Sequence, residues 1–536
     1  MTFHNAARLA LFFALFALAC CRFITPGLYL KAGQASFSAV KVVASIHSNS
    51  QLLRERSQLA AGSSQAMPTA SQPDSKQKSS APSSPPLLAP FPVRQGTKSM
   101  PYLVKPGQSV TSIAWHFLSQ TVYMRRTSLE NAIRQANGLK SDRLKPGQSI
   151  QIPGIPIQPV LDKPTTVPRT FQARAIYLTG WTAGSARGLD LIRKWKAVGG
   201  NAVVFDIKDY DGDVRVPYDH QYASHAGITI HNLPKYIHWL HAQNMHVIAR
   251  IALFRDAHLA QAYPEMDIRS RKTGKPWLEN GKLAWVDPSL PVVQDYELDL
   301  AKMVANDGAD EIQFDYVRFP AEGDQPDAEF AFQKDHPDWP RTKIITDFVA
   351  RAYQELHPMG VLVSLDVFGV MAWARPVDLN HTGQNITQLA RHCDVISPMI
   401  YPSHFFRFDG YSDPGDAPEH FISESMRRFG VATQGSGVVL RPWLQGFHWR
   451  TKTYSVEYVL TEIRVAAEQG GIGFLFWNAI NDYPKPMDAM LAMRAAGDLG
   501  YQGRTATKAS PRGGAAGKEL PTALPNAAKA ASPQAK

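Results

Sequence analysis

Four aspartates at the ends of apolar runs are the residues of this 536-residue chain best placed to do chemistry. They are Asp206 and Asp209 in AVVFDIKD, Asp315 in EIQFDY and Asp366 in VSLDVF. A carboxyl group at the end of a buried strand is costly unless it is paired or takes part in a reaction. Two such groups can share the acid and nucleophile (or base) roles across a glycosidic bond. The pattern predicts a carbohydrate-hydrolysing site with these four aspartates as candidate catalytic residues.

Aromatic and polar side chains lie at the ends of the neighbouring apolar runs. Aromatic faces stack on pyranose rings, and amides, imidazoles and guanidinium groups hydrogen-bond to sugar hydroxyls. This combination is typical of a sugar-binding site, although His404 could instead pack against its aromatic neighbours. The residues that we expect to bind substrate are Trp181, Tyr316, Arg318, Tyr401, His404, Trp443, Gln445, Trp477 and Asn478.

The elements that would position these residues alternate along residues 171–502. Eight apolar, β-rich runs separated by amphipathic stretches predict an α/β fold, a (β/α)8 TIM barrel, in which catalytic groups lie at the carboxyl ends of the strands. A doubly wound sheet is the alternative, but it requires a glycine-rich phosphate turn after its first strand, and TGWTAG lacks that spacing. The predicted strands are Ala175–Thr179, Ala202–Ile207, His246–Leu253, Glu311–Tyr316, Val361–Val367, Val395–Ile400, Pro442–Phe447 and Ile472–Trp477, with helices at Leu189–Val198, Leu233–Gln243, Val292–Asn306, Ile344–Leu356 and Val456–Glu468 among others.

Strand alternation indicates which carboxylates face the barrel interior. Apolar Ile312 and Phe314 must face the helices, so Asp315 points into the barrel mouth. The same alternation turns Asp366 and Asp206 inward. The alternative for each carboxylate is a structural ion pair with an inward base, and the bases available are Lys208, Arg250, Arg318 and Arg441.

The flanking residues suggest different roles for Asp315 and Asp366. Arg318 lies close to Asp315 in the sequence, and a nearby cation keeps a carboxylate ionised, as a nucleophile requires. Asp366 lies between Leu365 and Val367, a drier setting that would raise its pKa and suit the general acid/base. A carboxyl separation of about 5–5.5 Å would indicate a retaining hydrolase and about 6.5–9.5 Å an inverting one, whereas a gap well outside both ranges would indicate a binding barrel.

A small unit at residues 101–154 precedes the predicted barrel. A short strand leads into a Pro-Gly turn, and Ser109 stands at a helix N-cap position before an apolar helical pattern. A second helical stretch over Leu129–Ala136 and a strand containing Ile150 and Ile152 follow. This βααβ order with its two PGQS turns resembles a LysM module, which implies binding of N-acetylglucosamine-containing glycans.

The larger segment also resembles a known family. The motifs that carry the resemblance are RAIYLTGW, NAVVFDIKD, AWVDP, DEIQFDYVRFP, SPMIYPSH and RPWLQ, which span residues 174–445. They are similar to the bacterial "putative glycoside hydrolase" domain, a family related to amylase-like barrels. The resemblance implies a TIM barrel with a nucleophile ending strand four and an acid/base ending strand five, the places of Asp315 and Asp366. Such relatives usually carry Glu on strand five and an Arg two residues before the nucleophile, whereas here Arg318 follows it.

Composition and targeting signals indicate an exported protein. An apolar run within residues 1–21 reads as a signal peptide, a lipoprotein signal ending at Cys20, or a short anchor. Residues 22–100 include a Ser/Pro-rich linker, residues 155–170 are a Pro-rich connector, and residues 503–536 form an Ala/Pro/Lys tail. We expect a periplasmic or envelope-anchored location in a bacterium, with membrane contact only through the N-terminal anchor or lipid.

The distribution of charge and the spacing of possible metal ligands argue against nucleic-acid binding and against a calcium site. Residues 1–100 carry ten basic and two acidic side chains, so the net charge of +11 comes from tails and linkers, and nucleic-acid binding is not expected. The Asp209–Asp213 segment resembles the start of a calcium loop but lacks its closing Glu, and we interpret it as a turn. No cofactor or metal is expected.

The predicted function is an exported glycoside hydrolase acting on an envelope or extracellular polysaccharide. The alternatives are a non-catalytic glycan-binding barrel or a metal-dependent polysaccharide deacetylase using Asp256, His258, His238 and His241.

Overall fold

The computed structural model describes residues 96–224 and 227–497. The predicted signal or anchor at 1–21, residues 22–95 of the linker and the tail at 503–536 lie outside the described residues. Among the helices of the described ranges, none is long and apolar enough to cross a membrane.

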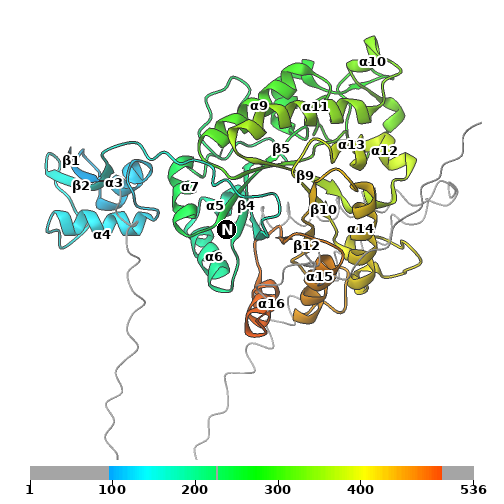
Figure 1. The fold of residues 1–536 in the computed structure, drawn as a ribbon. Coiled ribbons are helices and arrows are strands. Elements are labelled where there is room, and N and C mark those ends of the chain that lie inside the picture. Colours follow the sequence, from blue (N-terminus) through cyan, green and yellow to red (C-terminus); the bar gives the residue numbers. More distant parts are fainter. Residues whose placement is uncertain (1–95, 225–226, 498–536) are drawn as a thin grey trace, which may run out of the picture.

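The small unit has the predicted βααβ order (Figure 1). β1 (Thr97–Leu103) pairs antiparallel with β2 (Ser149–Pro156), and α3 (Val110–Phe117) and α4 (Arg126–Ala136) pack against this pair. The predicted N-cap is confirmed, because the side chain of Ser109 accepts a hydrogen bond from the backbone N–H at the third helical position of α3. The unit has an apolar core separate from that of the barrel, formed by Val104, Val110, Ile113, Ala114, Phe117, Leu129, Ile133, Ile150 and Ile152.

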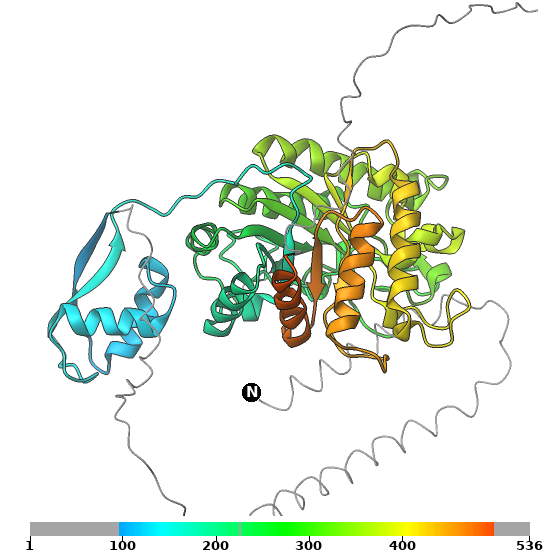
Figure 2. The ribbon, with the colours of Figure 1, turned by 60° about the horizontal axis from the view of Figure 1, so that its bottom comes forward.

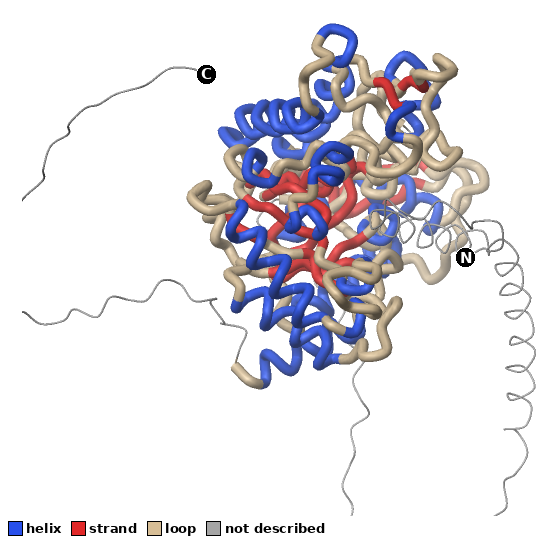
Figure 3. The backbone as a smooth tube through the Cα atoms, turned by 90° about the vertical axis from the view of Figure 1, so that its right-hand side faces the viewer, coloured by secondary structure: helices blue, strands red, loops and turns tan. Residues whose placement is uncertain are grey.

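The large unit is a closed barrel of parallel strands surrounded by helices, as predicted (Figures 1 and 3). Each strand pairs with its neighbours in chain order, and the last strand pairs with the first, so no edge remains open. The strands are β3 (Arg174–Leu178), β4 (Ala202–Lys208), β5 (His246–Ala252), β7 (Glu311–Asp315), β9 (Leu362–Phe368), β10 (Val395–Met399), β11 (Val439–Leu440) with β12 (Trp443–Gln445), and β13 (Phe474–Trp477).

Helices cover the outside of this barrel. The five helices named from the sequence are present as α6, α7, α9, α11 and α15, with ends that differ from the prediction by up to three residues. A two-stranded sheet of β6 (Arg269–Ser270) and β8 (Ala328–Glu329) lies in the loops. The helices are α5 (Gly180–Ala183), α6 (Ala186–Ala197), α7 (Leu233–Ala242), α8 (Ala257–Ala262), α9 (Pro291–Asn306), α10 (Phe332–Asp335), α11 (Arg341–Leu356), α12 (Pro376–Thr382), α13 (Ile386–Leu389), α14 (Pro418–Ala432), α15 (Val456–Glu468) and α16 (Pro484–Ala495).

The seventh strand differs from its prediction. A continuous strand was expected over Pro442–Phe447, but the structure has two short pieces, β11 and β12, with Arg441 and Pro442 between them. Proline has no N–H to donate to a neighbouring strand, which accounts for the interruption. The gap frees Arg441 to turn into the barrel, where its guanidinium contacts Glu311.

Side chains alternate between two apolar layers, as the sequence predicted. Ile312 and Phe314 belong to the outer layer between strands and helices. The inner layer fills the barrel itself, and Asp315 lies at its mouth. The inner layer consists of Ala173, Ala175, Tyr177, Ala202, Val204, Ile248, Tyr401, Trp443, Phe447 and Leu475.

The small unit lies beside the barrel (Figure 2), and polar groups at the start of α7 contact it. The ammonium of Lys235 donates hydrogen bonds to the carbonyls of Leu118 (2.6 Å) and Tyr123 (2.7 Å). Asn232 caps α7 and donates to the carbonyl of Ser119 at 2.9 Å. Two domains with separate cores are thus joined by specific hydrogen bonds.

An ion pair and the connector add to this attachment. Arg125 of the small unit pairs with Asp190 on α6. In the connector, Asp162 lies 3.1 Å from Nδ1 of His241 near the end of α7, and Nε2 of the same imidazole lies 3.1 Å from Asp310. The connector therefore follows the amino-terminal end of the barrel.

Candidate active site

The carboxyl ends of the strands surround a pocket with about 820 Å³ of empty space, its open mouth included. Of the predicted residues it brings together Asp315, Asp366, Tyr316, Arg318, Tyr401, Trp443 and Trp477. Residues that were not predicted to line a site are Tyr177, Thr179, Tyr210, Arg250, Phe368, Met399 and Ala479.

Arg250 on β5 connects three of the candidate carboxylates. Its Nη1 lies 2.5 Å from Asp206 and its Nη2 lies 2.6 Å from Asp315. Its Nε lies 3.8 Å from Asp366. Because Asp206 is the register partner of Arg250 on β4, and alternation turns both inward, the strand pairing itself brings this acid and base together. The structural ion pair considered as an alternative is thus present, but one base is shared by three acids.

Asp206 lies beneath the pocket rather than in its wall. The hydroxyl of Tyr177 donates a hydrogen bond to its Oδ2 at 2.6 Å, and Arg250 holds its Oδ1. Burial raises the pKa of Asp206 to about 6, although Arg250 and Tyr177 favour the ionised form. Both oxygens are engaged, which suits a residue that positions Arg250.

Asp315 is held from two sides at the end of β7. Arg250 binds its Oδ2, and the backbone N–H of Tyr316 donates to its Oδ1 at 2.6 Å. Tyr316 has φ of 51°, a left-handed conformation that is strained for a residue other than glycine. This turn fixes a carboxylate whose side chain is 13% exposed, at the pocket wall.

Asp366 occupies a drier environment at the end of β9. The indole N–H of Trp443 donates to its Oδ1 at 2.7 Å. Within the described part of the chain its Oδ2 has no hydrogen-bond partner, and the side chain is 1% exposed. Burial and the negative charge of Asp315 raise its pKa well above the usual range, so the protonated acid is favoured.

Asp315 and Asp366 are close enough to act on one bond. The Nε of Arg250 lies 3.2 Å from Oδ2 of Asp315 and 3.8 Å from Oδ2 of Asp366. The two oxygens cannot be further apart than the sum of these distances. That limit excludes most of the range of about 6.5–9.5 Å typical of inverting hydrolases, and it includes the range of about 5–5.5 Å typical of retaining ones.

An aromatic wall stands beside these carboxylates. Trp477 stacks on Tyr177 with ring centres 6.5 Å apart and lies 5.7 Å from Tyr401. Trp443 meets Tyr177 edge-on at 6.3 Å. Tyr177, Tyr401 and Trp443 are almost fully buried and Trp477 is half-buried, so acid groups and aromatic rings share the wall of one cavity.

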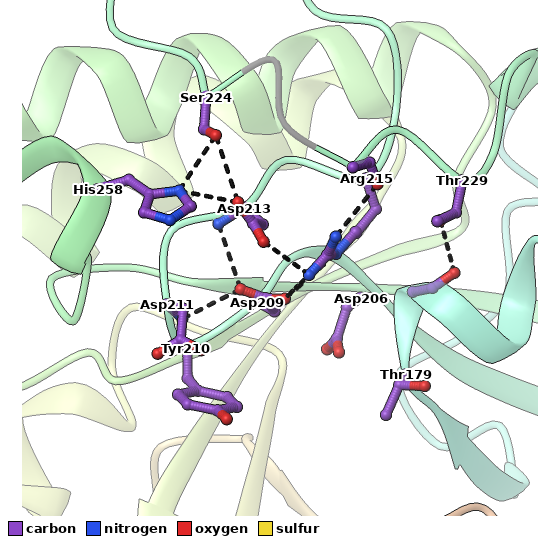
Figure 4. Close-up of polar contacts among 12 residues, drawn as sticks. Thr179, Asp206, Asp209, Tyr210, Asp211, Asp213, Arg215, Ser224, Thr229 and His258 are labelled. Carbon is purple, nitrogen blue, oxygen red and sulfur yellow. Dashed lines mark hydrogen bonds and ion pairs between the residues drawn. The ribbon is translucent and has the colours of Figure 1, made fainter. Parts of the chain in front are cut away.

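Asp209 is not among the residues that line the pocket, and its polar contacts are with residues of the following loop (Figure 4). It pairs with Arg215, and its Oδ1 accepts the backbone N–H groups of Asp211 (3.0 Å) and Asp213 (3.2 Å). The segment resembling a calcium loop is a turn, as interpreted from the sequence. Trp181 also lies away from the pocket lining, 61% exposed, with the guanidinium of Arg215 centred 4.7 Å from its ring.

Three further predicted residues support the loops behind the pocket instead of lining it. His404 packs 4.8 Å from the ring of Trp449, and burial lowers its pKa to about 3. Gln445 donates to the carbonyl of Phe447 at 3.0 Å, and Asn478 donates to a neighbouring backbone carbonyl at 2.8 Å. Their polar groups are turned toward the protein.

The histidines considered for a deacetylase are held apart by different partners. His238 and His241 contact Asp162 of the connector, whereas His258 lies 2.8 Å from Asp213. Residues 96–224 and 227–497 include no group of three or more His, Cys, Asp or Glu side chains arranged to hold a metal ion.

The comparison with protein families agrees with this geometry. The model described as "Putative glycosyl hydrolase domain" matches residues 175–483, which contain every barrel strand from β4 to β13 and nearly all of β3. The chain belongs to this glycosyl hydrolase family. A LysM domain matches residues 102–153, which identifies the small unit. None of the curated proteins matches the chain.

Several solved structures resemble parts of the chain. A hypothetical protein from Ruminiclostridium thermocellum is 34% identical over 36% of this chain and 97% of that one, with a TM-score of 0.32. The PgaB (BpsB) glycoside hydrolase domain of Bordetella bronchiseptica is 13% identical over 63% and 100%, with a TM-score of 0.44. The spore cortex-lytic enzyme SleL of Bacillus megaterium is 12% identical over 73% and 85%, with a TM-score of 0.37.

Proposed function

We propose that this protein is an exported enzyme that hydrolyses glycosidic bonds in a cell-envelope or extracellular polysaccharide. The observation that carries the proposal is the pair Asp315 and Asp366, two carboxyl groups in one pocket with opposite environments. Asp315 is ion-paired with Arg250, and Asp366 has a pKa raised well above the usual range. Such divergence within a pair separates a nucleophile from a general acid.

In this mechanism Asp315 attacks the anomeric carbon while Asp366 protonates the departing glycosidic oxygen. Arg250 and the N–H of Tyr316 orient the attacking carboxylate. The Oδ2 of Asp366, which has no hydrogen-bond partner within the described chain, donates its proton to the glycosidic oxygen, and the sugar is left bonded to Asp315. Asp366 then takes a proton from a water molecule that attacks the anomeric carbon, breaks the bond to Asp315 and restores both carboxyl groups. The limit on the Oδ2–Oδ2 distance includes the retaining range and only the lower end of the inverting range, which supports retention of anomeric configuration as the proposed outcome.

The LysM module holds the enzyme on an N-acetylglucosamine-containing glycan in this proposal, and the N-terminal apolar run exports it. Export is tested by fusing residues 1–100 to a reporter that is active only outside the cytoplasm. A signal is expected, and a well-expressed but silent fusion contradicts it.

A non-catalytic glycan-binding barrel is the second candidate, and one observation favours it. Asp366 is only 1% exposed, so substrate reaches it only at the bottom of the pocket. A binding protein would need the aromatic wall of Tyr177, Trp443 and Trp477 but no accessible acid.

The deciding experiment is a glycan-release screen of the purified protein against envelope and extracellular polysaccharides. Asp315→Asn serves as the matched inactive control, because it keeps the size of the side chain and removes the charge. The proposal expects soluble oligosaccharides from the wild type alone, with products that retain the anomeric configuration in proton NMR. Glycan retention without release by either protein would favour the binding barrel.

A further inference from the structure

The pocket contains a second guanidinium, that of Arg318, for which no direct contact with a described carboxylate is found; Glu279, Asp315 and Glu322 favour its charged form only from a greater distance. Arg318 lines the pocket and is only 8% exposed. Its one hydrogen bond within the described chain is from Nη1 to the carbonyl of Phe319 at 3.0 Å, and no described carboxylate lies within ion-pair distance. Arg250, the other pocket arginine, is by contrast in contact with three acids.

Three aromatic rings hold the Arg318 guanidinium in place. Its centre lies 4.5 Å from the ring of Phe368, 4.7 Å from Trp285 and 5.3 Å from Tyr316. Aromatic faces attract a cation but accept no in-plane hydrogen bond, so within the described chain only Nη1 has an acceptor, the carbonyl of Phe319. A buried cation fixed in this way is prepared to bind an anion, and its planar fork matches a carboxylate.

Arg318 lies beside the two candidate catalytic acids, and so beside the glycosidic bond that they would cleave. Arg318 follows Asp315 by three residues, and Phe368 follows Asp366 by two. The contact between Arg318 and Phe368 therefore joins the two strand ends that carry the candidate catalytic acids. An anion bound by Arg318 would belong to a sugar at or next to the cleaved linkage.

We infer that the substrate is an acidic glycan, whose ring-borne carboxylate pairs with Arg318. This inference rests on the proposed function only in taking the pocket as the glycan site. The carboxylate could be a uronic acid group or a lactyl ether on the ring. Both present the same planar anion, and both are tested below.

The experiment measures equilibrium binding of four-sugar probes to the full-length protein by calorimetry. The probes are neutral cellotetraose, its fully oxidised glucuronate counterpart, and cellotetraose carrying a lactyl ether on O3. None contains N-acetylglucosamine, so the LysM module does not contribute. At least one acidic probe is expected to bind about 10- to 100-fold more tightly than the neutral one, as a charge-assisted pair allows. The better acidic probe identifies the source of the carboxylate.

Two variants test whether Arg318 causes this preference. Arg318→Gln should bring the acidic-to-neutral affinity ratio close to one, and Arg318→Lys should keep part of it, because the charge remains without the fork. The preference should weaken with added salt. Equal binding of acidic and neutral probes, no binding of any, or a preference that survives Arg318→Gln overturns the inference.

Failure of the proposed function gives a different result. Acidic preference in binding without hydrolysis of any glycan would contradict the enzyme and leave the acidic-glycan site standing. Hydrolysis of neutral glycans without a binding preference for acidic probes would support the enzyme and contradict the acidic-glycan site. If Arg318→Gln does not fold, the wild-type ratio and Arg318→Lys still decide.

Discussion

Strand β7 carries an acidic residue at each end of the barrel interior, and the two ends differ in how charge is balanced. At the amino-terminal end, both oxygens of Glu311 contact Nη1 of Arg441 (3.0 and 2.7 Å), and His246 lies 3.1 Å away. Burial alone would raise the pKa of Glu311, but Arg441 and His246 lower it to about 2. At the mouth, Arg250 is shared among three carboxylates, and the pKa values of Asp206 and Asp366 are raised.

We interpret the amino-terminal cluster as structural and the cluster at the mouth as the candidate catalytic one. Both ends contain buried acids and an arginine, so composition and burial alone do not distinguish them. At the amino-terminal end the base satisfies its acid, whereas at the mouth acids outnumber the base beside an open cavity. An excess of acid in a cavity raises the pKa of a carboxyl group, which is the property that the proposed general acid requires.

The largest expected effect is loss of turnover at the mouth. Asp315→Asn should lower kcat by about 10³-fold or more, because it removes the nucleophile, while glycan binding remains. Arg250 keeps Asp206 and Asp366 as partners, so the melting temperature should change little. Near wild-type kcat would exclude Asp315 as the nucleophile, and Asp206 would be tested next.

Glu311→Gln, at the other end of the same strand, should show the opposite pattern. It leaves the guanidinium of Arg441 buried without its acid, and breaking such a pair costs about 3–5 kcal/mol of unfolding free energy. The kcat of the folded fraction should stay within about twofold of wild type, since the site is at the far end of the barrel. Denaturant unfolding with activity measured on the same samples checks both. A stable but inactive variant would show that the two ends are not independent.

The raised pKa of Asp366 gives the next effect, in pH dependence. Because the folded state binds this proton more tightly than the unfolded chain, stability falls as pH rises through the raised pKa, and kcat/KM falls with it as the acid ionises. Asp366→Asn should raise the melting temperature above that pKa by about 2 °C. It should also slow substrates with poor leaving groups more than those with good ones. Equal slowing of both would argue against the acid role.

The smallest effect concerns His241 near the amino-terminal end. Burial opposes its charged form, but hydrogen bonds to Asp162 and Asp310 raise its pKa to about 9. This contribution to stability is complete below the unfolded pKa of about 6.5 and is lost as pH rises through about 9. His241→Gln should cost about 1 kcal/mol at pH 6, because the pair is partly solvated, and nothing at pH 10. An equal loss at both pH values would mean that packing, not charge, is responsible.

Local patterns in the sequence predicted the barrel and half of the site. Two-residue alternation placed Asp315 and Asp366 inward because it depends only on neighbours along one strand. The same alternation turns Arg250 and Tyr177 inward, but the sequence analysis did not assign them to the pocket. Their contacts are with acids on other strands, which the pattern along a single strand does not reveal. Asp209 was predicted to be catalytic because it ends a strand, and only the folded loop shows it paired with Arg215.

Two other features could not be predicted from short-range patterns. Gln445 ends β12 and Asn478 follows β13 as expected, whereas Trp181 lies in α5. The directions of all three side chains depend on loop backbones whose path no periodicity determines. The contact of Lys235 with the LysM module joins residues more than a hundred positions apart. In the sequence Lys235 is one lysine within a helical pattern, and nothing nearby distinguishes it from a lysine that faces solvent.

The attachment of the LysM module has a consequence for how a glycan strand could be handled. In a (β/α)8 barrel the start of each helix lies near the carboxyl end of the preceding strand, so Lys235 in the first turn of α7 is on the pocket side. A module on a free tether samples many positions, and its effective concentration is set by linker length. A docked module is instead held at a fixed distance from the pocket. The module and the pocket can bind one glycan strand together only when their two binding positions on that strand are separated by this distance. If the pocket cleaves the strand, the length of the released glycan fragments would then be determined by the architecture of the protein.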